Sequence, residues 1–429
     1  MRGTYFRYLF ENPDGGLFHT GSIYDKEKQR AVTYLYMAGS SSRDAPQEEE
    51  AGSGRIDLLV MGAYSANYIK KLIAILKNHE IETMILPYLA PIQRLVLAEE
   101  LKDGSMEGQE AVRFLQDPYQ FTQRLAVSNI YFLYGNGAPF QREPEELERG
   151  FHFEPADRAA MRQIREMEGY ELPVVRAGYL VIDEFLFYFG VYGPNIQRLS
   201  EFAVEYFSHI ENIDPLSENA GEDYNSQMKR LAREFLRRFG HSSMATVVMF
   251  EAPLHTSSEE NESFFTEKEF NGQKDDCAGW ENNRKGGRLS CVVSCTYGRD
   301  YENLQRHKRN AEKMRFGILM LGNLNLNRYL IELLERFLRV LPQVRAIGVP
   351  NCGSGENWNH KILELFSGKD RIYWICARHD ITSAGVVSDI ALSSPNHRVV
   401  PVSEEWGCCL SGYLIPKENI DEVKRALRS

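Results

Sequence analysis

The sequence contains no long hydrophobic run. Its longest apolar runs, such as 316–321 and 372–377, are far shorter than the roughly 20 residues that an α-helix needs to cross a bilayer. Residues 1–7 also lack the continuous apolar stretch and the small-residue cleavage site of a secretory signal. We therefore expect no membrane-spanning segment and a cytoplasmic protein.

An excess of basic residues is absent as well. The 429 residues include 60 Asp or Glu and 50 Lys or Arg, which gives a formal net charge of −10. This charge disfavours nucleic-acid binding over the whole surface and leaves only local basic patches for it. Each patch is typical of a solvated helical face, with phosphate contact as the alternative. The two patches are Lys229, Arg230, Arg233, Arg237 and Arg238, and residues 306–315.

Cysteine is scarce, with seven in the chain, and this odd number argues for reduced thiols over a disulfide framework. Cys291 and Cys295 could form a zinc knuckle with Cys277 and His307. The two valines between the first pair are, however, more typical of a strand. The ten histidines show no ligand spacing, so we expect no metal site and no cofactor.

Hydrophobic patterning predicts an α/β fold. Short strands are expected at 4–10, 16–24 and 31–39, because these runs are rich in aromatic and β-branched residues and are separated by segments of turn residues. The polar, charged segment 40–54 is predicted to be mobile. A strand at 56–61, a helix containing Ile69, Leu72, Ile73 and Leu76, and a strand at 83–86 then follow.

The last third of the chain alternates between strand and helix patterns, which is typical of a sheet covered by helices. The expected strands are 316–321, 344–349, 371–377 and 397–402, and the expected helices are 328–341, 357–366, 383–392 and 417–427.

The middle of the chain is mixed, and the segment 255–288 is predicted to be a flexible surface insertion because it is dense in polar residues. Helices are expected at 111–114, 155–168, 196–210 and 224–239, and strands at 184–191 and 245–250.

The segment 56–72, Ile-Asp-Leu-Leu-Val-Met-Gly-Ala-Tyr-Ser-Ala-Asn-Tyr-Ile-Lys-Lys-Leu, resembles the central motif of the metallo-β-lactamase-fold hydrolases. In that family a strand ends in Ser-His-x-x-x-Asp-His-x-x-Gly-Leu, often with a further metal ligand between the first His and the Asp. The strand, the helix start and the final Leu match in character. The ligand positions instead hold Ala63, Ser65, Asn67 and Tyr68.

Three further segments resemble motifs of the same family, each without its metal ligand. The early strand that ends in Asp-x-Gly-Ser has Met37 in place of the Asp, and the later strand that ends in Gly-Asp has Asn323. The Pro-His-His-Gly-Ser turn has Asn351 and Cys352 in place of both histidines. The resemblance covers about 5–406, nearly the whole chain.

This resemblance implies an α/β protein with a metallo-β-lactamase-like αββα sandwich. Residues 1–100 would form its N-terminal half, 101–240 a mixed or helical insertion, and 241–429 its C-terminal half. More weakly, 381–383 stands where competence-type and defence-type bacterial relatives carry His-Pro-Ser.

The missing ligands imply that the chemistry is missing too. A catalytic zinc ion needs about three N, O or S ligands and an open position for water. Ala63 and Met37 offer no suitable donor, and neutral amides replace neither a carboxylate nor an imidazole. Without the ion no hydroxide forms near neutral pH. The resemblance therefore suggests a catalytically inactive structural or regulatory subunit, with a protein partner, in a bacterial complex for phage defence or nucleic-acid processing.

Two alternatives stay open. In the first, the degenerate cleft binds a nucleotide or another small ligand through neutral hydrogen-bonding and aromatic side chains. In the second, the protein is a hydrolase or nuclease with a relocated metal site. The residues that would line the ligand-binding cleft are Tyr64, Ser65, Asn67, Tyr68, Asn323 and Asn351.

Overall fold

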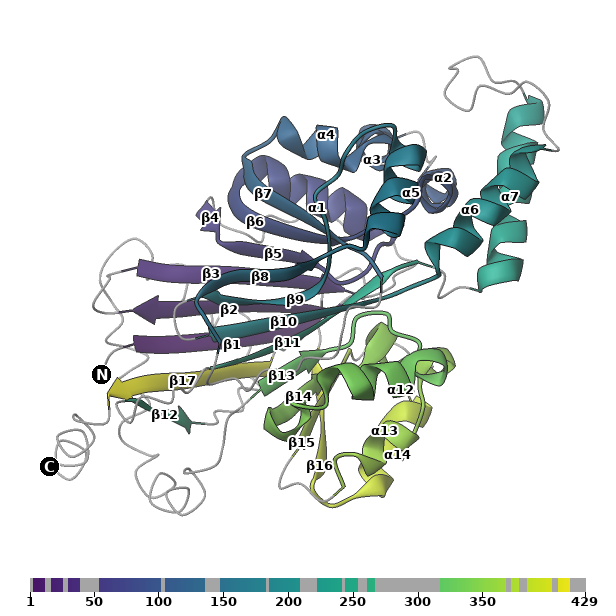
Figure 1. The fold of residues 1–429 in the computed structure, drawn as a ribbon. Helices are drawn as coiled ribbons and strands as arrows, with labels where there is room; N and C mark the ends of the chain where they lie inside the picture. The colour runs from purple at the N-terminus through teal and green to yellow at the C-terminus, as the bar shows by residue number, and fades with distance from the viewer. Residues whose placement is uncertain are drawn as a thin grey trace, which may run out of the picture.

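The protein has a mixed α/β fold in which strands join into one large mixed sheet (Figure 1). Within the described residues, no helix is both long enough and apolar enough to cross a membrane. The computed structural model describes residues 3–11, 17–25, 30–38, 54–101, 105–135, 147–182, 185–208, 222–240, 244–253, 261–266, 317–367, 372–377, 384–402 and 408–416.

The chain begins with an antiparallel meander of β1 (Gly3–Glu11), β2 (Leu17–Asp25) and β3 (Arg30–Ala38), which confirms the first three predicted strands. Strand β3 then pairs in parallel with β5 (Leu58–Met61). The predicted mobile segment 40–54 lies almost wholly outside the described residues; only β4 (Gly54–Ile56) begins at its end.

A parallel block continues the sheet from β5 to β6 (His79–Pro87) and β7 (Val127–Leu133). Helices cover it on one side (Figure 1). They are α1 (Ala66–Asn78), α2 (Pro91–Glu100), α3 (Met106–Gln116) and α4 (Pro118–Gln123).

The middle of the chain adds antiparallel strands and three helices. Strand β10 pairs with both β9 and β11, and β9 also pairs with β7 and β8. The elements are β8 (Gly150–Pro155), α5 (Arg158–Glu168), β9 (Val174–Ile182), β10 (Phe185–Tyr192), α6 (Ile196–Ser208), α7 (Glu222–Phe239) and β11 (Thr246–Pro253).

A second parallel block follows, as the alternating pattern of the last third predicts, and its first strand pairs with β11. Its strands are β13 (Gly317–Met320), β14 (Val344–Gly348), β15 (Ile372–Ala377) and β16 (His397–Val402), and its helices are α12 (Leu326–Phe337), α13 (Lys361–Glu364) and α14 (Ala384–Ser393).

Two sequence predictions in this half were wrong in part. The helix expected at 357–366 is a 3₁₀ turn at Gly355–Asn357 followed by the single turn of α13, because Trp358 between them adopts an extended conformation. The segment 255–288 contains a strand, β12 (Asn261–Thr266), which pairs with β17 (Cys408–Pro416). The structure does not describe three further segments: the remainder of 255–288, residues 291–315, and the helix expected at 417–427.

Strand β10 reveals the layers, because successive residues of a strand face opposite sides. The ring of Phe187 lies 4.9 Å from that of Tyr34 in β3. The ring of the next residue, Tyr188, lies 4.9 Å from that of Phe337 in α12. The N-terminal strands therefore pack on one face of β10 and α12 packs on the other. Figure 1 shows α1–α4 and α12–α14 on opposite sides of the strands.

Candidate functional site at the converging strand ends

Three turns that follow parallel strands converge at one place. The N–H of Asn351, after β14, donates a hydrogen bond to the carbonyl of Gly322, after β13, at 2.7 Å. Gly322 has φ +59°, and a Cβ there would lie 2.8 Å from the Tyr36 hydroxyl and 3.3 Å from the carbonyl of Gly62, after β5. Both the conformation and the close approach require glycine.

Strand β11 closes this place from the side. Ala63 forms an isolated β-bridge with Thr246, and the N–H of Val247 donates to the carbonyl of Gly62 at 2.7 Å. The hydroxyl of Tyr36 donates to the carbonyl of Val247 at 2.7 Å. The carbonyls of Gly62 and Val247 therefore accept hydrogen bonds from within the protein and do not face a ligand.

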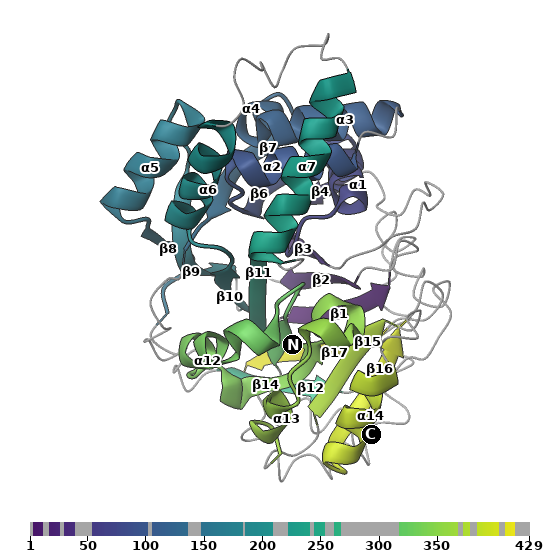
Figure 2. The ribbon, with the colours of Figure 1, turned by 90° about the vertical axis from the view of Figure 1, so that its right-hand side faces the viewer.

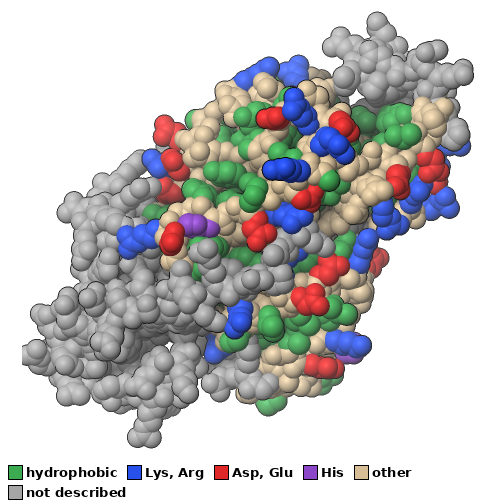
Figure 3. Space-filling view, viewed as in Figure 1, with side chains coloured by type: hydrophobic (Ala, Val, Ile, Leu, Met, Phe, Trp, Pro, Cys, Tyr) green, Lys and Arg blue, Asp and Glu red, His purple; other side chains and the backbone are tan. Residues whose placement is uncertain are grey.

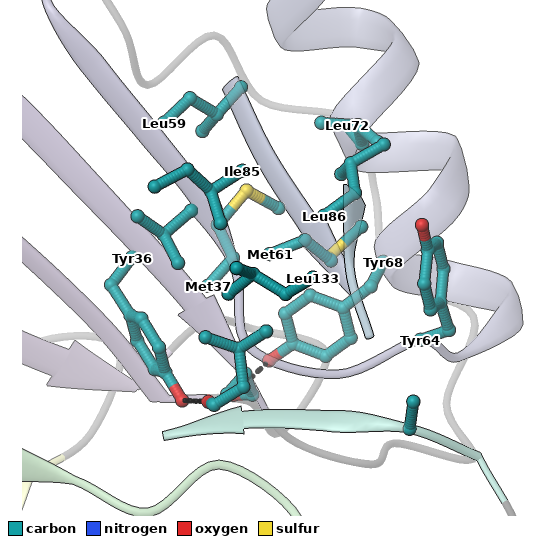
Figure 4. Close-up of a cluster of buried hydrophobic side chains, with 14 of the residues drawn as sticks. Tyr36, Met37, Leu59, Met61, Tyr64, Tyr68, Leu72, Ile85, Leu86 and Leu133 are labelled. Carbon is teal, nitrogen blue, oxygen red and sulfur yellow. Dashed lines mark hydrogen bonds between the residues drawn. The ribbon is translucent and has the colours of Figure 1, made fainter. Parts of the chain in front are cut away.

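Tyr68 fills the interior of the site. Its ring is 1% exposed and its hydroxyl donates to the carbonyl of Ala38 at 2.9 Å (Figure 4). The ring lies 5.9 Å from that of Phe18. Met37, which is fully buried, accepts a hydrogen bond at its carbonyl from the N–H of Gly62 at 2.6 Å. The interior is thus occupied by apolar side chains and by the two internally bonded hydroxyls of Tyr36 and Tyr68.

Ser65 and Asn67 lie at the start of α1. Ser65 is its N-cap, and its hydroxyl accepts a hydrogen bond from the N–H of Tyr68 at 3.3 Å. A serine in this position satisfies one of the helix's unpaired N–H groups, so its presence has a structural reason. Asn67 is partly buried in the first turn.

Tyr64 turns away from the others, as Figure 4 shows by the opposite directions of Tyr64 and Tyr68. It is buried, and it lines a small cavity together with Tyr88, Arg94 and Glu168. Burial raises the pKa of Tyr64, and the positive charge of Arg94 opposes that rise. The structure therefore does not place Tyr64 with the other predicted cleft residues.

Asn323 and Asn351 lie on the two turns that touch. The carbonyl of Asn323 accepts a hydrogen bond from the side-chain amide of Asn357 at 3.5 Å. Asn351 has φ +48°, and it alone among the described non-glycine residues has a positive φ. Asparagine tolerates this left-handed conformation better than most residues, which gives a backbone reason for its presence.

Sequence reasoning missed a buried cluster beneath α2. Arg94 forms an ion pair with Glu168 at 2.5 Å, and Tyr88 donates its hydroxyl to the same carboxylate at 2.9 Å. Arg94 also donates to the carbonyls of Leu115 and Gln116. The cavity beside it has room for about one water molecule. No spacing pattern could have found this cluster, because its side chains come from separate helices and loops.

A second missed cluster lies between the strands of the two halves. His19 of β2 lies 3.4 Å from the carboxylate of Glu251 in β11, and its ring nitrogen is 3.1 Å from the Tyr34 hydroxyl. The side chains of His19 and Glu251 are fully buried. The pairing of an imidazole with a carboxylate suits acid–base chemistry, but full burial keeps it out of reach of a substrate in this structure.

The residues at the converging strand ends do not fit a zinc ion. Met37 and Ala63 supply no hard donor, and the hydroxyl of Tyr68 is already bonded to a carbonyl. No group of three His, Cys, Asp or Glu that could hold a metal ion is found in the part of the chain that the structure describes.

Comparison with family models, curated proteins and solved structures finds no match to this chain. The candidate site therefore has to be judged on its own geometry.

Proposed function

We propose that this chain is a catalytically inactive, metallo-β-lactamase-like αββα sandwich that serves as a structural or regulatory subunit of a cytoplasmic bacterial complex. The order of the strands supports the fold: a meander that leads into a parallel block, then an antiparallel segment that leads into a second parallel block. Helices on both outer sides support it as well (Figure 1).

The environment of Tyr68 carries the functional part of the proposal. The residue stands where the resembling family has the last histidine of its central motif, yet its ring is buried and its hydroxyl donates to Ala38. A metal-bound water is the nucleophile of such hydrolases, and a site filled by Tyr68 and Met37 leaves no place to generate it. A role in binding a protein partner is then the simplest use of a retained fold, and defence or nucleic-acid processing is the setting that the resemblance suggests.

The small-ligand alternative has less support, because three of its six residues have other roles, and one of them is the buried Tyr68. Tyr64 points into a separate cavity and Ser65 caps α1. The alternative of a relocated metal site also lacks a candidate ligand group among the described residues.

Metal content tests the proposal directly. We expect purified protein to hold well under one zinc or manganese ion per chain, and chelator to leave its melting temperature unchanged, because no metal-linked folding energy is available. Stoichiometric metal, or a chelator-induced loss of several degrees in melting temperature, would show that the protein is a metalloprotein.

A variant with four restored ligands separates the scaffold from the ligand-binding alternative. It combines Ala63→His, Asn67→Asp, Tyr68→His and Asn323→Asp. Once a partner has been identified by crosslinking, we expect this variant, if its melting curve is intact, to retain partner binding. Loss of partner binding would place the working surface in the cleft, as would nucleotide binding by the parent protein that the variant loses.

A further inference from the structure

Helix α7 has an exposed face on which basic side chains gather, although the chain as a whole is acidic. Lys229, Arg230, Arg233 and Arg237 are exposed and lie within an arc of about 100° on the helical wheel. Lys229 and Arg237 are eight residues apart, so this basic face is about 12 Å long.

The cations of this face differ in whether an acidic side chain already neutralises them. Arg237 forms a salt bridge with Glu234 at 2.5 Å, and Arg238 forms one with Glu205 of α6 at 2.6 Å.

Lys229, Arg230 and Arg233 form no salt bridge with any acidic side chain that the structure describes. Glu234 nevertheless faces Arg230, because its pKa is lowered first by the hydrogen bond with Arg237 and further by the charges of Arg237, Arg238 and Arg230. Arg233 donates a hydrogen bond to the carbonyl of Lys229 at 3.3 Å. Figure 3 shows basic and acidic side chains interspersed over the visible face.

The opposite face of α7 is fully used by the fold. Leu231 and Phe235 are fully buried, and the ring of Phe202 in α6 lies 5.7 Å from that of Phe235 and 5.5 Å from that of Phe239. An amphipathic helix that inserts into a membrane surface needs its apolar face free to enter the lipid. The apolar face of α7 is not free, so its basic face suits a partner that is recognised by charge alone.

We propose that Lys229, Arg230 and Arg233, on the exposed basic face of α7, bind the phosphate backbone of nucleic acid. Guanidinium groups match phosphate oxygens with paired, charge-assisted hydrogen bonds, and two of the three cations are arginines. The helix is accessible, because it runs across the front of the molecule in Figure 2 and lies at its edge with α6 in Figure 1.

The net charge of −10 sets the expected character of this binding. The rest of the surface repels a polyanion, so affinity should be modest and should depend steeply on salt. Three phosphate contacts predict that log affinity falls with log salt concentration with a slope of about −2 to −3.

Fluorescence anisotropy with labelled single-stranded and duplex DNA, between 50 and 200 mM salt, tests the proposal. We expect the triple variant Lys229→Gln, Arg230→Gln and Arg233→Gln to bind at least about tenfold more weakly at the lowest salt, with a flatter salt slope. A matched control removes three exposed basic residues elsewhere: Arg113→Gln, Arg124→Gln and Lys361→Gln. The control should bind within about twofold of the parent, because its residues lie outside α7, and its equal change in net charge separates the position of the charges from their number.

A second variant changes binding in the opposite direction. Glu205→Gln with Glu234→Gln removes the partners of Arg238 and Arg237. It should raise DNA affinity by about threefold or more and steepen the salt slope. Thermal melts that match the parent's would confirm that the helix is intact in all three variants.

Four results would overturn the proposal. The first is no DNA binding by the parent at 50 mM salt, and the second is an equal loss in the triple variant and its control. The third is no gain in the glutamate variant. The fourth is a stronger α7-dependent preference for phosphatidylserine vesicles or an acidic peptide than for DNA.

Discussion

The two outer helical layers contain buried clusters of different chemistry: the N-terminal cluster joins helices to one another, and the C-terminal cluster joins residues beside α13 to strand β15. On the N-terminal side, α2 carries Arg94, whose ion pair with Glu168 and bonds to backbone carbonyls lie in the interior. On the C-terminal side, the ring of Trp374 in β15 packs edge-on against Trp358 at 5.7 Å and Phe366 at 5.9 Å.

This difference predicts which substitutions lower the stability of each cluster. A buried ion pair costs much desolvation to form, so it adds little net stability, yet removing one partner leaves an unpaired charge in the interior. An aromatic cluster stabilises through the area it buries and through ring geometry, and it loses stability in proportion to the atoms removed. The Arg94 cluster should therefore depend on matching partners, and the Trp374 cluster on volume.

The largest effect is expected from Trp374→Ala. The side chain is fully buried, so its removal should lower the free energy of unfolding by about 3–5 kcal/mol, as measured by urea denaturation. Trp374→Phe is the control: it keeps a ring and removes an indole N–H that has no hydrogen-bond partner among the described residues. A loss in the Phe variant equal to that in the Ala variant would contradict the importance of volume.

A smaller effect, of about 3 kcal/mol in unfolding free energy, is expected from Glu168→Gln. The change leaves Arg94 charged and buried without its carboxylate. The double variant Arg94→Met and Glu168→Leu removes both charges and should be more stable than Glu168→Gln, and its remaining cost of about 1–3 kcal/mol is the buried hydroxyl of Tyr88, which loses its partner. If the double variant is as unstable as the single one, packing rather than charge pairing holds α2 and the comparison between the layers fails.

Much of this fold could be predicted from the local sequence, because most strands differ from their neighbours in residue type and hydrophobic period. The strands at 4–10, 16–24 and 31–39 are short runs of aromatic and β-branched residues separated by turn residues. The last third of the chain alternates between the hydrophobic periods of strands and of helices. Helix α2 gave no such signal, since it buries Gln93 and Arg94 beside apolar residues. Strand β8 gave none because all of its residues are partly or fully exposed.

The candidate site could be predicted in part. The sequence placed Ala63, Asn323 and Asn351 after strands, and the structure brings those strand ends together. It could not reveal that Tyr64 points into another cavity while Tyr68 fills the site, because a side chain's direction depends on the helix that follows.

The smallest effect concerns the one histidine packed against the aromatic cluster in the described structure. The ring of His397 lies 5.7 Å from that of Trp374, and its Nδ1 is 2.7 Å from the Ser393 hydroxyl. Burial lowers the pKa of His397, and a hydrogen bond with the backbone of Phe366 partly offsets this. The folded protein therefore holds this proton less tightly than the unfolded chain does.

The sign of the effect follows from that difference. The neutral ring contributes stability above the ordinary histidine pKa, and this contribution is lost as pH falls through the lowered pKa of the folded state. Urea denaturation at pH 7.5, 6.5 and 5.5 should show the parent losing more stability on acidification than His397→Asn, which cannot gain the proton. Equal pH dependence of the unfolding free energy in both proteins would contradict the prediction. It would mean that protonation of His397 does not affect the aromatic cluster, and the contrast with the Arg94 cluster would then be sharper than we infer.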